Sequence, residues 1–140
     1  MGPRSMSTSS APFSHPVRIY WEDTDAGGIV FYANYLKFFE RARTEWLRHL
    51  GIEQQSLREA TGGFFVVSDT SLKYHRPAKL DDRLNVTATV TQAGQASLVL
   101  FQQAWRDNTL LCEGSIRIGW VNAQSLKPAR IPVSVLKALT

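Results

Sequence analysis

Apolar and polar positions alternate near the start of the chain and then follow a helical period. Val17, Ile19 and Trp21 alternate with more hydrophilic neighbours, which predicts a strand over this segment. Large apolar residues return at helical spacing within 34–50, and Gly51 supplies a C-terminal stop. The pattern therefore predicts a strand, a turn and then one long amphipathic helix.

From residue 64 onward, apolar residues recur at every second position. This period predicts long strands, with a hairpin turn at Asp107-Asn108. The further predicted segments are a weak helix at 52–60, strands at 64–74, 83–91, 98–106 and 109–121, and a short helix at 134–139. One long helix followed by consecutive strands predicts an α+β fold, with a curved antiparallel sheet of about five strands wrapped over the helix. Such a sheet leaves one face and an edge strand uncovered, which favours self-association.

The length and composition suit one domain with a hydrophobic core. The chain has 140 residues, of which 44% are hydrophobic, so a second domain has no room. Residues 1–14 are rich in Ser and Pro and show no period, so we expect a disordered tail there and a single domain over 15–140. Met6 is a candidate native start, behind an expression remnant at 2–5.

The charged residues, the cysteine and the histidines limit which partners, metal sites and compartment we expect for this protein. The net charge is +4, but the basic residues are scattered among acids, so nucleic-acid binding is not expected. Cys112, the single cysteine, lies in a hydrophobic run and is expected to be a core residue in a reducing compartment. His15, His49 and His75 lie at no metal-ligand spacing, so no metal is expected. No apolar stretch is long enough to span a bilayer and no signal peptide is recognisable, which predicts a cytoplasmic protein.

The segment 20–35 carries the clearest chemical signal. A strand-like run breaks into an acidic turn with two adjacent glycines, and this turn leads directly into the long helix. Unpaired backbone N–H groups at a helix start can bind an oxyanion, and a nearby carboxylate such as Asp25 can attack a carbonyl held there or activate water against it. The same residue types also form ordinary turns, so both interpretations stand at this point.

The same segment resembles the signature of hot-dog-fold thioesterases of the 4-hydroxybenzoyl-CoA thioesterase family. In that signature a strand ending in an aromatic residue is followed by Asp-x-Asp, Gly-Ile-Val, aromatic residues and Asn-Tyr. The resemblance extends over about 17–132, with further matches at 38–45, 77–82 and 108–111, and is closest to the acyl-CoA thioesterases associated with the Tol-Pal system. It implies a hot-dog fold and cofactor-free hydrolysis of acyl-CoA. It also implies a homodimer or homotetramer with active sites between subunits, and association with a membrane-linked complex without a membrane span.

The resemblance assigns roles to individual residues. Asp25 matches the second Asp of Asp-x-Asp and is the expected nucleophile or general base; the sequence leaves both roles open. Asp23 is the expected turn former. The backbone N–H of Tyr32 is the expected oxyanion donor, at a position where many Tol-Pal-associated enzymes have His and the 4-hydroxybenzoyl-CoA enzymes have Tyr. The remaining matches in this segment are expected to contact substrate: Gly27, Gly28, Ile29, Val30 and Ala33.

Recognition of the coenzyme A phosphates needs cations from elsewhere in the chain. In the 4-hydroxybenzoyl-CoA enzymes a basic cluster precedes a Ser-Phe that opens a strand, but the matching stretch here, 92–97, has no Lys or Arg. Arg76 and Lys79 are the alternative candidates for charge-assisted hydrogen bonds to phosphate. Ser68, midway along its predicted strand, is a candidate for the lining of the acyl pocket.

Two other functions compete with thioester hydrolysis. A hot-dog dehydratase or hydratase would need a His paired with a carboxylate in the pocket, and no His lies near Asp25 in the sequence. A non-catalytic module could instead bind acyl-CoA and dock on a membrane-associated assembly. Activity on a panel of acyl-CoA thioesters distinguishes the three. Both aliphatic and aromatic acyl pockets are apolar, so the acyl preference stays open.

Overall fold

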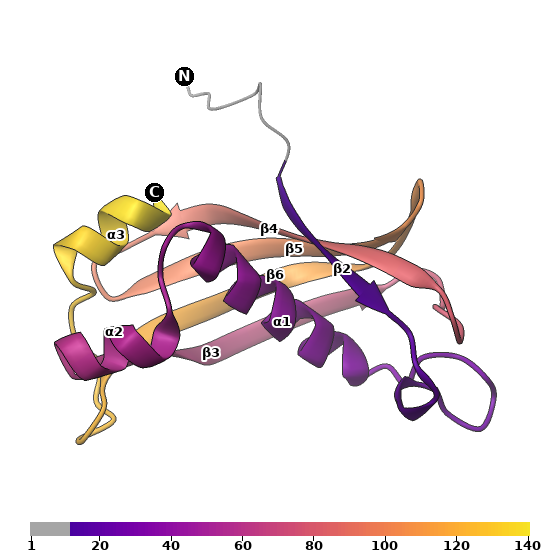
Figure 1. Ribbon diagram of the computed structural model, residues 1–140, viewed down its shortest axis with the longest axis horizontal. Helices are drawn as coiled ribbons and strands as arrows, with labels where there is room; N and C mark the ends of the chain where they lie inside the picture. The colour runs from indigo at the N-terminus through magenta and orange to yellow at the C-terminus, as the bar shows by residue number, and fades with distance from the viewer. Residues whose placement is uncertain (1–11) are drawn as a thin grey trace.

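The computed structural model describes residues 12–140, which form a five-stranded antiparallel sheet with a long helix across one face (Figure 1). The helix is α1, and two shorter helices lie near the end of the sheet at which α1 ends. The elements in chain order are β2 (Phe13–Arg18), the 3₁₀ turn η1 (Trp21–Asp23), α1 (Asn34–His49), α2 (Gln54–Thr61), β3 (Gly63–Tyr74), β4 (Arg83–Ala93), β5 (Ser97–Arg106), β6 (Thr109–Asn122) and α3 (Val133–Leu139).

The strands are ordered β2-β4-β5-β6-β3, so the two strands nearest the N-terminus form the two edges. Strands β4, β5 and β6 pair as consecutive hairpins, whereas β3 pairs with β6 and β2 pairs with β4. The free edge of β3 is exposed over residues 67–71. This open antiparallel α+β architecture confirms the fold class expected from the sequence.

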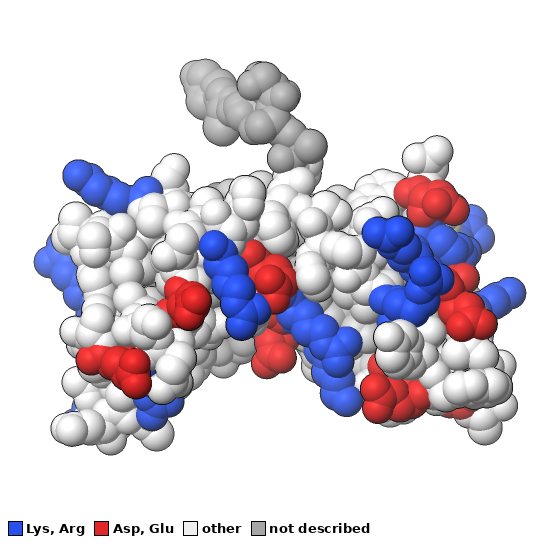
Figure 2. Space-filling view, in the orientation of Figure 1, with Lys and Arg blue, Asp and Glu red and all other residues white. Residues whose placement is uncertain are grey.

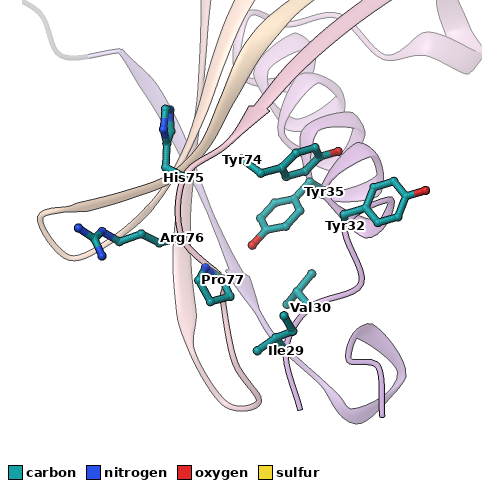
Figure 3. Close-up of a pocket in the computed structure, with 8 residues that line it drawn as sticks. All are labelled: Ile29, Val30, Tyr32, Tyr35, Tyr74, His75, Arg76 and Pro77. Atoms are coloured by element: carbon teal, nitrogen blue, oxygen red, sulfur yellow. The ribbon is translucent and has the colours of Figure 1, made fainter. Parts of the chain in front are cut away.

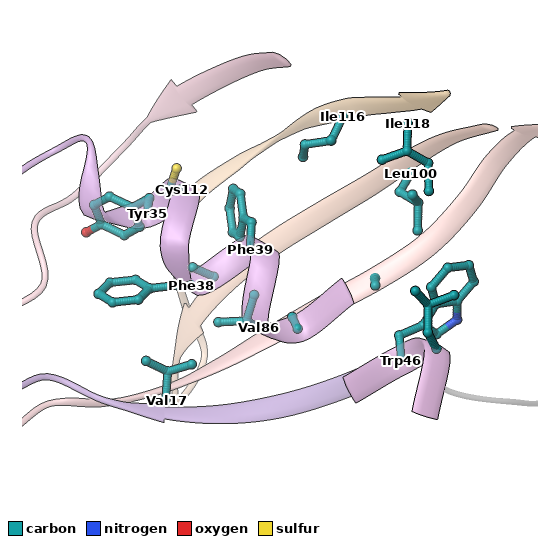
Figure 4. Packing of buried hydrophobic residues seen from close by; sticks show 14 of the residues in the cluster. Val17, Tyr35, Phe38, Phe39, Trp46, Val86, Leu100, Cys112, Ile116 and Ile118 are labelled. Atoms are coloured by element: carbon teal, nitrogen blue, oxygen red, sulfur yellow. The ribbon is translucent and has the colours of Figure 1, made fainter. Parts of the chain in front are cut away.

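The core lies between α1 and the face of the sheet that the helix covers (Figure 4). One stripe of the helix, including Phe38, Phe39 and Trp46, is buried against inward residues of β4, β5 and β6 such as Leu100 and Ile116. Burying apolar area of this kind stabilises a fold by about 25 cal/mol per Å². The helical spacing within 34–50 and the period of two in the strands therefore predicted the two halves of one core.

The first strand differs from its prediction at both ends. It begins at Phe13, inside the segment expected to be a tail, and it ends at Arg18. Trp21 is not an inward strand residue, since it lies in η1 with 78% of its surface exposed. The reason is the Asp23 carboxylate, which accepts the Tyr20 N–H at 2.8 Å and turns the chain before the alternation is complete. The other tail residues, 1–11, and the candidate start Met6 lie outside the described residues.

The remaining predicted elements are present with boundary shifts of a few residues. The long helix ends at His49, followed by Gly51 with φ +84°. Cys112 is fully buried, and burial raises the pKa of its thiol to about 12, which confirms it as a core residue. Within residues 12–140 no helix is long and apolar enough to cross a membrane.

Candidate active site

Asp23 holds the acidic turn between η1 and α1 together by accepting several hydrogen bonds. Asp23 is buried, and its carbonyl oxygen accepts the Phe31 N–H at 3.0 Å and the Asn34 side-chain amide at 2.8 Å. Its carboxylate accepts the Tyr20 N–H, as described above. Asp23 thus ties the start of the turn to the start of α1, as expected of a turn former.

Asp25 lies exposed at the tip of the same loop. Its Oδ1 accepts the Gly27 N–H at 2.8 Å, and its own backbone N–H donates to Ile29 O at 2.8 Å. Gly28 has φ +81°, a left-handed conformation that glycine adopts without strain. Among residues 12–140 no donor bonds to Oδ2 of Asp25, so this oxygen is accessible for chemistry.

Two backbone N–H groups immediately before α1 have no acceptor among residues 12–140. The N–H of Asn34 donates to Phe31 O at 2.9 Å and that of Tyr35 donates to Tyr32 O at 3.4 Å. The N–H groups of Tyr32 and Ala33 donate to no acceptor in the described part of the chain. Two adjacent free donors at the positive end of a 16-residue helix can stabilise a developing oxyanion.

Beside these donors is a cavity of about 220 Å³ walled by three tyrosines (Figure 3). The Tyr74 ring meets Tyr32 edge-on at 6.0 Å and Tyr35 at 5.7 Å between centroids. The hydroxyl of Tyr35 accepts the Ala78 N–H at 3.2 Å, and burial raises the pKa of Tyr35. The cavity is lined by Ile29, Val30, Tyr32, Tyr35, Tyr74, His75, Arg76 and Pro77. An apolar aromatic wall of this kind suits an acyl group.

The structure brings together most of the residues expected at the site. Ile29, Val30, Tyr32 and Arg76 line the tyrosine cavity, and Gly27, Gly28 and Ala33 lie on the adjoining loop and helix start. Lys79 is also nearby, because it forms an antiparallel bridge with Ile29. Asp25 lies on this loop but does not line the cavity.

Ser68 lies away from this group. It sits at the bulge of the edge strand β3, exposed, with its Oγ at 3.3 Å from Asp69 Oδ2 and 3.4 Å from Arg117 O. Within one protomer Ser68 therefore does not line the tyrosine cavity.

The cations near the cavity are Arg76 and Lys79, the two candidates named in place of a basic cluster at 92–97. The 92–97 stretch spans the end of β4, the β4–β5 turn and the first residue of β5, and it lies close to α3 because Gln95 O accepts the Ile131 N–H. Arg76 and Lys79 are exposed near the acidic loop, where Lys and Arg side chains lie mixed with acids (Figure 2). Arg106 is not an unpaired cation, since its Nη1 lies 2.8 Å from Oδ2 of Asp82 in an ion pair.

Sequence reasoning missed Tyr35, Tyr74 and Pro77 as cavity residues. Tyr35 belongs to the Asn-Tyr of the recognised signature and was available as a candidate. Tyr74 ends β3 and Pro77 follows it, so both are about 40 residues from the loop in sequence and no local pattern connects them to it.

His75 is paired with a carboxylate, but on the outer side of the cavity. Its Nε2 lies 2.8 Å from Oε2 of Glu113, and Gln103 donates to the other oxygen at 3.1 Å. The hydrogen bonds from Gln103 and His75 lower the pKa of Glu113. The ring of His75 points away from the tyrosines (Figure 3). Within residues 12–140 no cluster of three or more His, Cys, Asp or Glu could hold a metal.

Several proteins with similar sequences or structures are named as thioesterases. A family model described as the thioesterase-like superfamily matches residues 19–139. The acyl-CoA thioesterase YbgC of Haemophilus influenzae is 43% identical over 90% of this chain and 93% of that protein. The acyl-CoA thioester hydrolase YbgC of Escherichia coli O6:H1 is 43% identical over 89% of this chain and 92% of that protein. A probable thioesterase from Bartonella henselae has a similar structure, with a TM-score of 0.82 and 31% identity, covering 87% of this chain and 100% of that chain. The chain therefore belongs to the thioesterase-like superfamily and is an enzyme of the thioester-hydrolase class.

Proposed function

We propose that this protein hydrolyses acyl-CoA to a free carboxylic acid and coenzyme A, with Asp25 as the reacting carboxylate. The observation that carries this proposal is the juxtaposition, in one short loop, of Asp25 and the free N–H groups of Tyr32 and Ala33. The names of the YbgC relatives support the substrate class. No cofactor enters the reaction.

Two routes for Asp25 fit this arrangement. As a nucleophile, Oδ2 attacks the thioester carbon, the C–S bond breaks, coenzyme A leaves as a thiol after protonation, and water hydrolyses the mixed anhydride. As a general base, the carboxylate takes a proton from water, whose oxygen attacks the same carbon. The C–S bond then breaks, and the departing thiolate of coenzyme A takes up the proton. In both routes the Tyr32 N–H stabilises the oxyanion. Label found in the Asp25 carboxylate after a single turnover in ¹⁸O-labelled water would identify the nucleophilic route, because the general-base route places the label in the product acid alone.

Recognition of the substrate is divided between the cavity and the surface. The acyl group would occupy the tyrosine cavity, where Ile29 and Val30 form the loop side of the wall. Arg76 borders that cavity and Lys79 is bridged to Ile29, so these two cations are the groups we propose for the coenzyme A phosphates. Ser68 would contact substrate only where a second subunit brings the β3 edge to the site.

We extend the proposal to a homo-oligomer with active sites between subunits, working in the cytoplasm. The free β3 edge and the exposed aromatic side chains Trp21 and Tyr32, 78% and 63% exposed, support a partner copy. Membership of the 4-hydroxybenzoyl-CoA branch and association with the Tol-Pal system or another membrane-linked complex remain predictions from sequence resemblance.

The test of the proposed function is turnover on a panel of aliphatic and aromatic acyl-CoA thioesters. We expect the wild type to release free thiol. Asp25→Asn keeps the size of the side chain but removes the negative charge, so its kcat should fall about 10³-fold or more. Binding of acyl-CoA without hydrolysis would instead identify a non-catalytic binding module. Full activity in Asp25→Asn would move the reacting group elsewhere.

A further inference from the structure

A second cavity lies farther along α1, between this helix, α2 and β3. Its volume is about 300 Å³, at the lower end of the range for small-ligand sites. Arg43, which is one of its lining residues, is nine positions after Asn34, so it lies roughly 14 Å along the helix from its start. The cavity is therefore separate from the tyrosine cavity at the beginning of α1.

Arg43 is the charged group that faces this cavity from inside the fold. Its Nη1 donates at 3.0 Å to Oε1 of Gln102, a residue with no exposed surface. The amide of Gln102 donates to Phe39 O at 3.1 Å and to Thr87 O at 3.2 Å, so only its oxygen remains for Arg43. This arrangement fixes the position of the guanidinium and leaves most of its five N–H groups for another acceptor.

The Arg43 cation is partly desolvated and lacks an ion-pair partner. Burial lowers its pKa, and Glu40 acts in the opposite direction. Across residues 12–140 no carboxylate lies within ion-pair distance of Arg43, although the exposed Glu40 also borders the cavity. A half-buried cation without a carboxylate at ion-pair distance is unfavourable, and an anion in the cavity would reduce that cost.

We propose that this cavity is a binding site for the anion of an aliphatic carboxylic acid of short or medium chain length, with Arg43 holding the carboxylate. The walls that would take the chain are apolar, and are formed by Trp46, Leu47, Phe65, Val66 and Ile118. A carboxylate matches the planar guanidinium through paired, charge-assisted hydrogen bonds. The ligand is of the same chemical class as the acid released in the proposed reaction, but its binding requires no turnover.

The experiment uses quenching of Trp46 fluorescence by 8-bromooctanoate, with 8-bromooctanol as the neutral comparison. The wild type should show saturable quenching, with a midpoint at least tenfold lower for the acid than for the alcohol. Arg43→Met keeps the length of the side chain and removes the charge, so it should abolish this preference. Arg43→Lys keeps the charge and should retain part of it, which covers the case in which Arg43→Met fails to fold.

Two further variants make the result specific to the cavity. Glu40→Gln removes the opposing charge at the rim and should bind the acid at least as tightly as the wild type. Trp46→Phe should lose the saturable component of quenching. Equal midpoints for acid and alcohol in the wild type, an unchanged midpoint in Arg43→Met, or undiminished quenching in Trp46→Phe would each overturn the proposal. None of these outcomes depends on hydrolysis, so they leave the proposed function untouched.

Discussion

At the scale of single residues, two carboxylates in one loop have opposite surroundings. Asp23 is 6% exposed and accepts a hydrogen bond from the chain before it, whereas Asp25 is exposed with Oδ2 unbonded among the described residues. Replacing Asp23 with Asn removes a charge-assisted acceptor, so we expect a loss of about 1–3 kcal/mol in the free energy of unfolding. Urea denaturation measures this loss. Its matched partner Asp25→Asn should unfold like the wild type and lose turnover; the reverse result would exchange the two roles.

Glu113 offers a test of pH dependence at the same scale. Because hydrogen bonds from Gln103 and His75 lower its pKa in the folded state, its contribution to stability is complete above the unfolded pKa of about 4.3. That contribution is lost as the pH falls further, through the folded-state pKa. We expect the free energy of unfolding of Glu113→Gln, measured by urea denaturation at each pH, to fall less than that of the wild type between pH 5 and pH 3. The control is Glu59→Gln, a substitution at an exposed position, which should follow the wild type. Parallel curves for all three proteins would contradict this assignment.

The sequence predicted the candidate site only as far as local patterns extend. The loop from Asp23 to Ala33 was recognised because its motif residues are close together in the sequence. The far wall, with Tyr74 and Pro77, was missed because strand pairing and the chain after β3 bring it there. The partnerships of Arg43 with Gln102 and of His75 with Glu113 likewise join residues 59 and 38 positions apart, which no periodicity reveals.

At the scale of elements, the close pairing of β3 with β6 depends on Gly114. A Cβ at this position would lie 2.0 Å from Ser71 O and 2.6 Å from a Leu72 side-chain carbon. Gly114→Ala must therefore push the two strands apart, and we expect it to lower the free energy of unfolding by about 1–3 kcal/mol or more. Gly119→Ala on the same strand is the control, since a Cβ at this position would lie 3.9 Å from Ala96 O, an ordinary contact distance. Equal stability of the two variants at one protein concentration would contradict the prediction.

Periodicity predicted the elements better than their ends or their order. The helix within 34–50 and the long strands are where their spacing placed them, because burial of one face dictates both the period and the structure. Trp21 fits an alternating pattern but does not belong to the sheet. The Asp23 carboxylate accepts the Tyr20 N–H, and this bond turns the chain before it reaches Trp21. The edge position of β3 was not predictable in the same way, because it results from pairing with β6, whose partner residues lie 38 to 59 positions later in the chain.

At the scale of the whole molecule, one protomer leaves both a sheet edge and aromatic surface uncovered. Residues 67–71 of β3 are exposed, as are Trp21 and Tyr32. Exposed edges and apolar surface favour pairing with another chain, so we expect a dimer or a dimer of dimers. Light scattering at micromolar concentration should give at least twice the chain mass of 15.7 kDa. A stable monomer at that concentration would reject the prediction.

The distribution of charge over the molecule sets an expectation for substrate recognition. Since the 92–97 turn has no cation, and Arg76 and Lys79 are exposed and screened by salt, most of the binding energy should come from the pantetheine and acyl parts. We expect kcat/KM for an acyl-pantetheine to be within about 10²-fold, or ~2.7 kcal/mol, of that for the matching acyl-CoA. A larger difference would show strong phosphate anchoring, and Arg76 and Lys79 would be the first residues to replace.

The loop that carries Asp25 is closed by contacts among its own residues, including the antiparallel bridge between Thr24 and Val30. The opposite wall of the cavity comes from a different part of the chain, at Tyr74 and Pro77. Under the proposed mechanism, part of the wall that selects the acyl chain is therefore encoded apart from the groups that react. Substitutions at the end of β3 and just after it can alter the preferred substrate while the reaction is preserved. Specificity can therefore diverge among related enzymes that keep the same reacting groups.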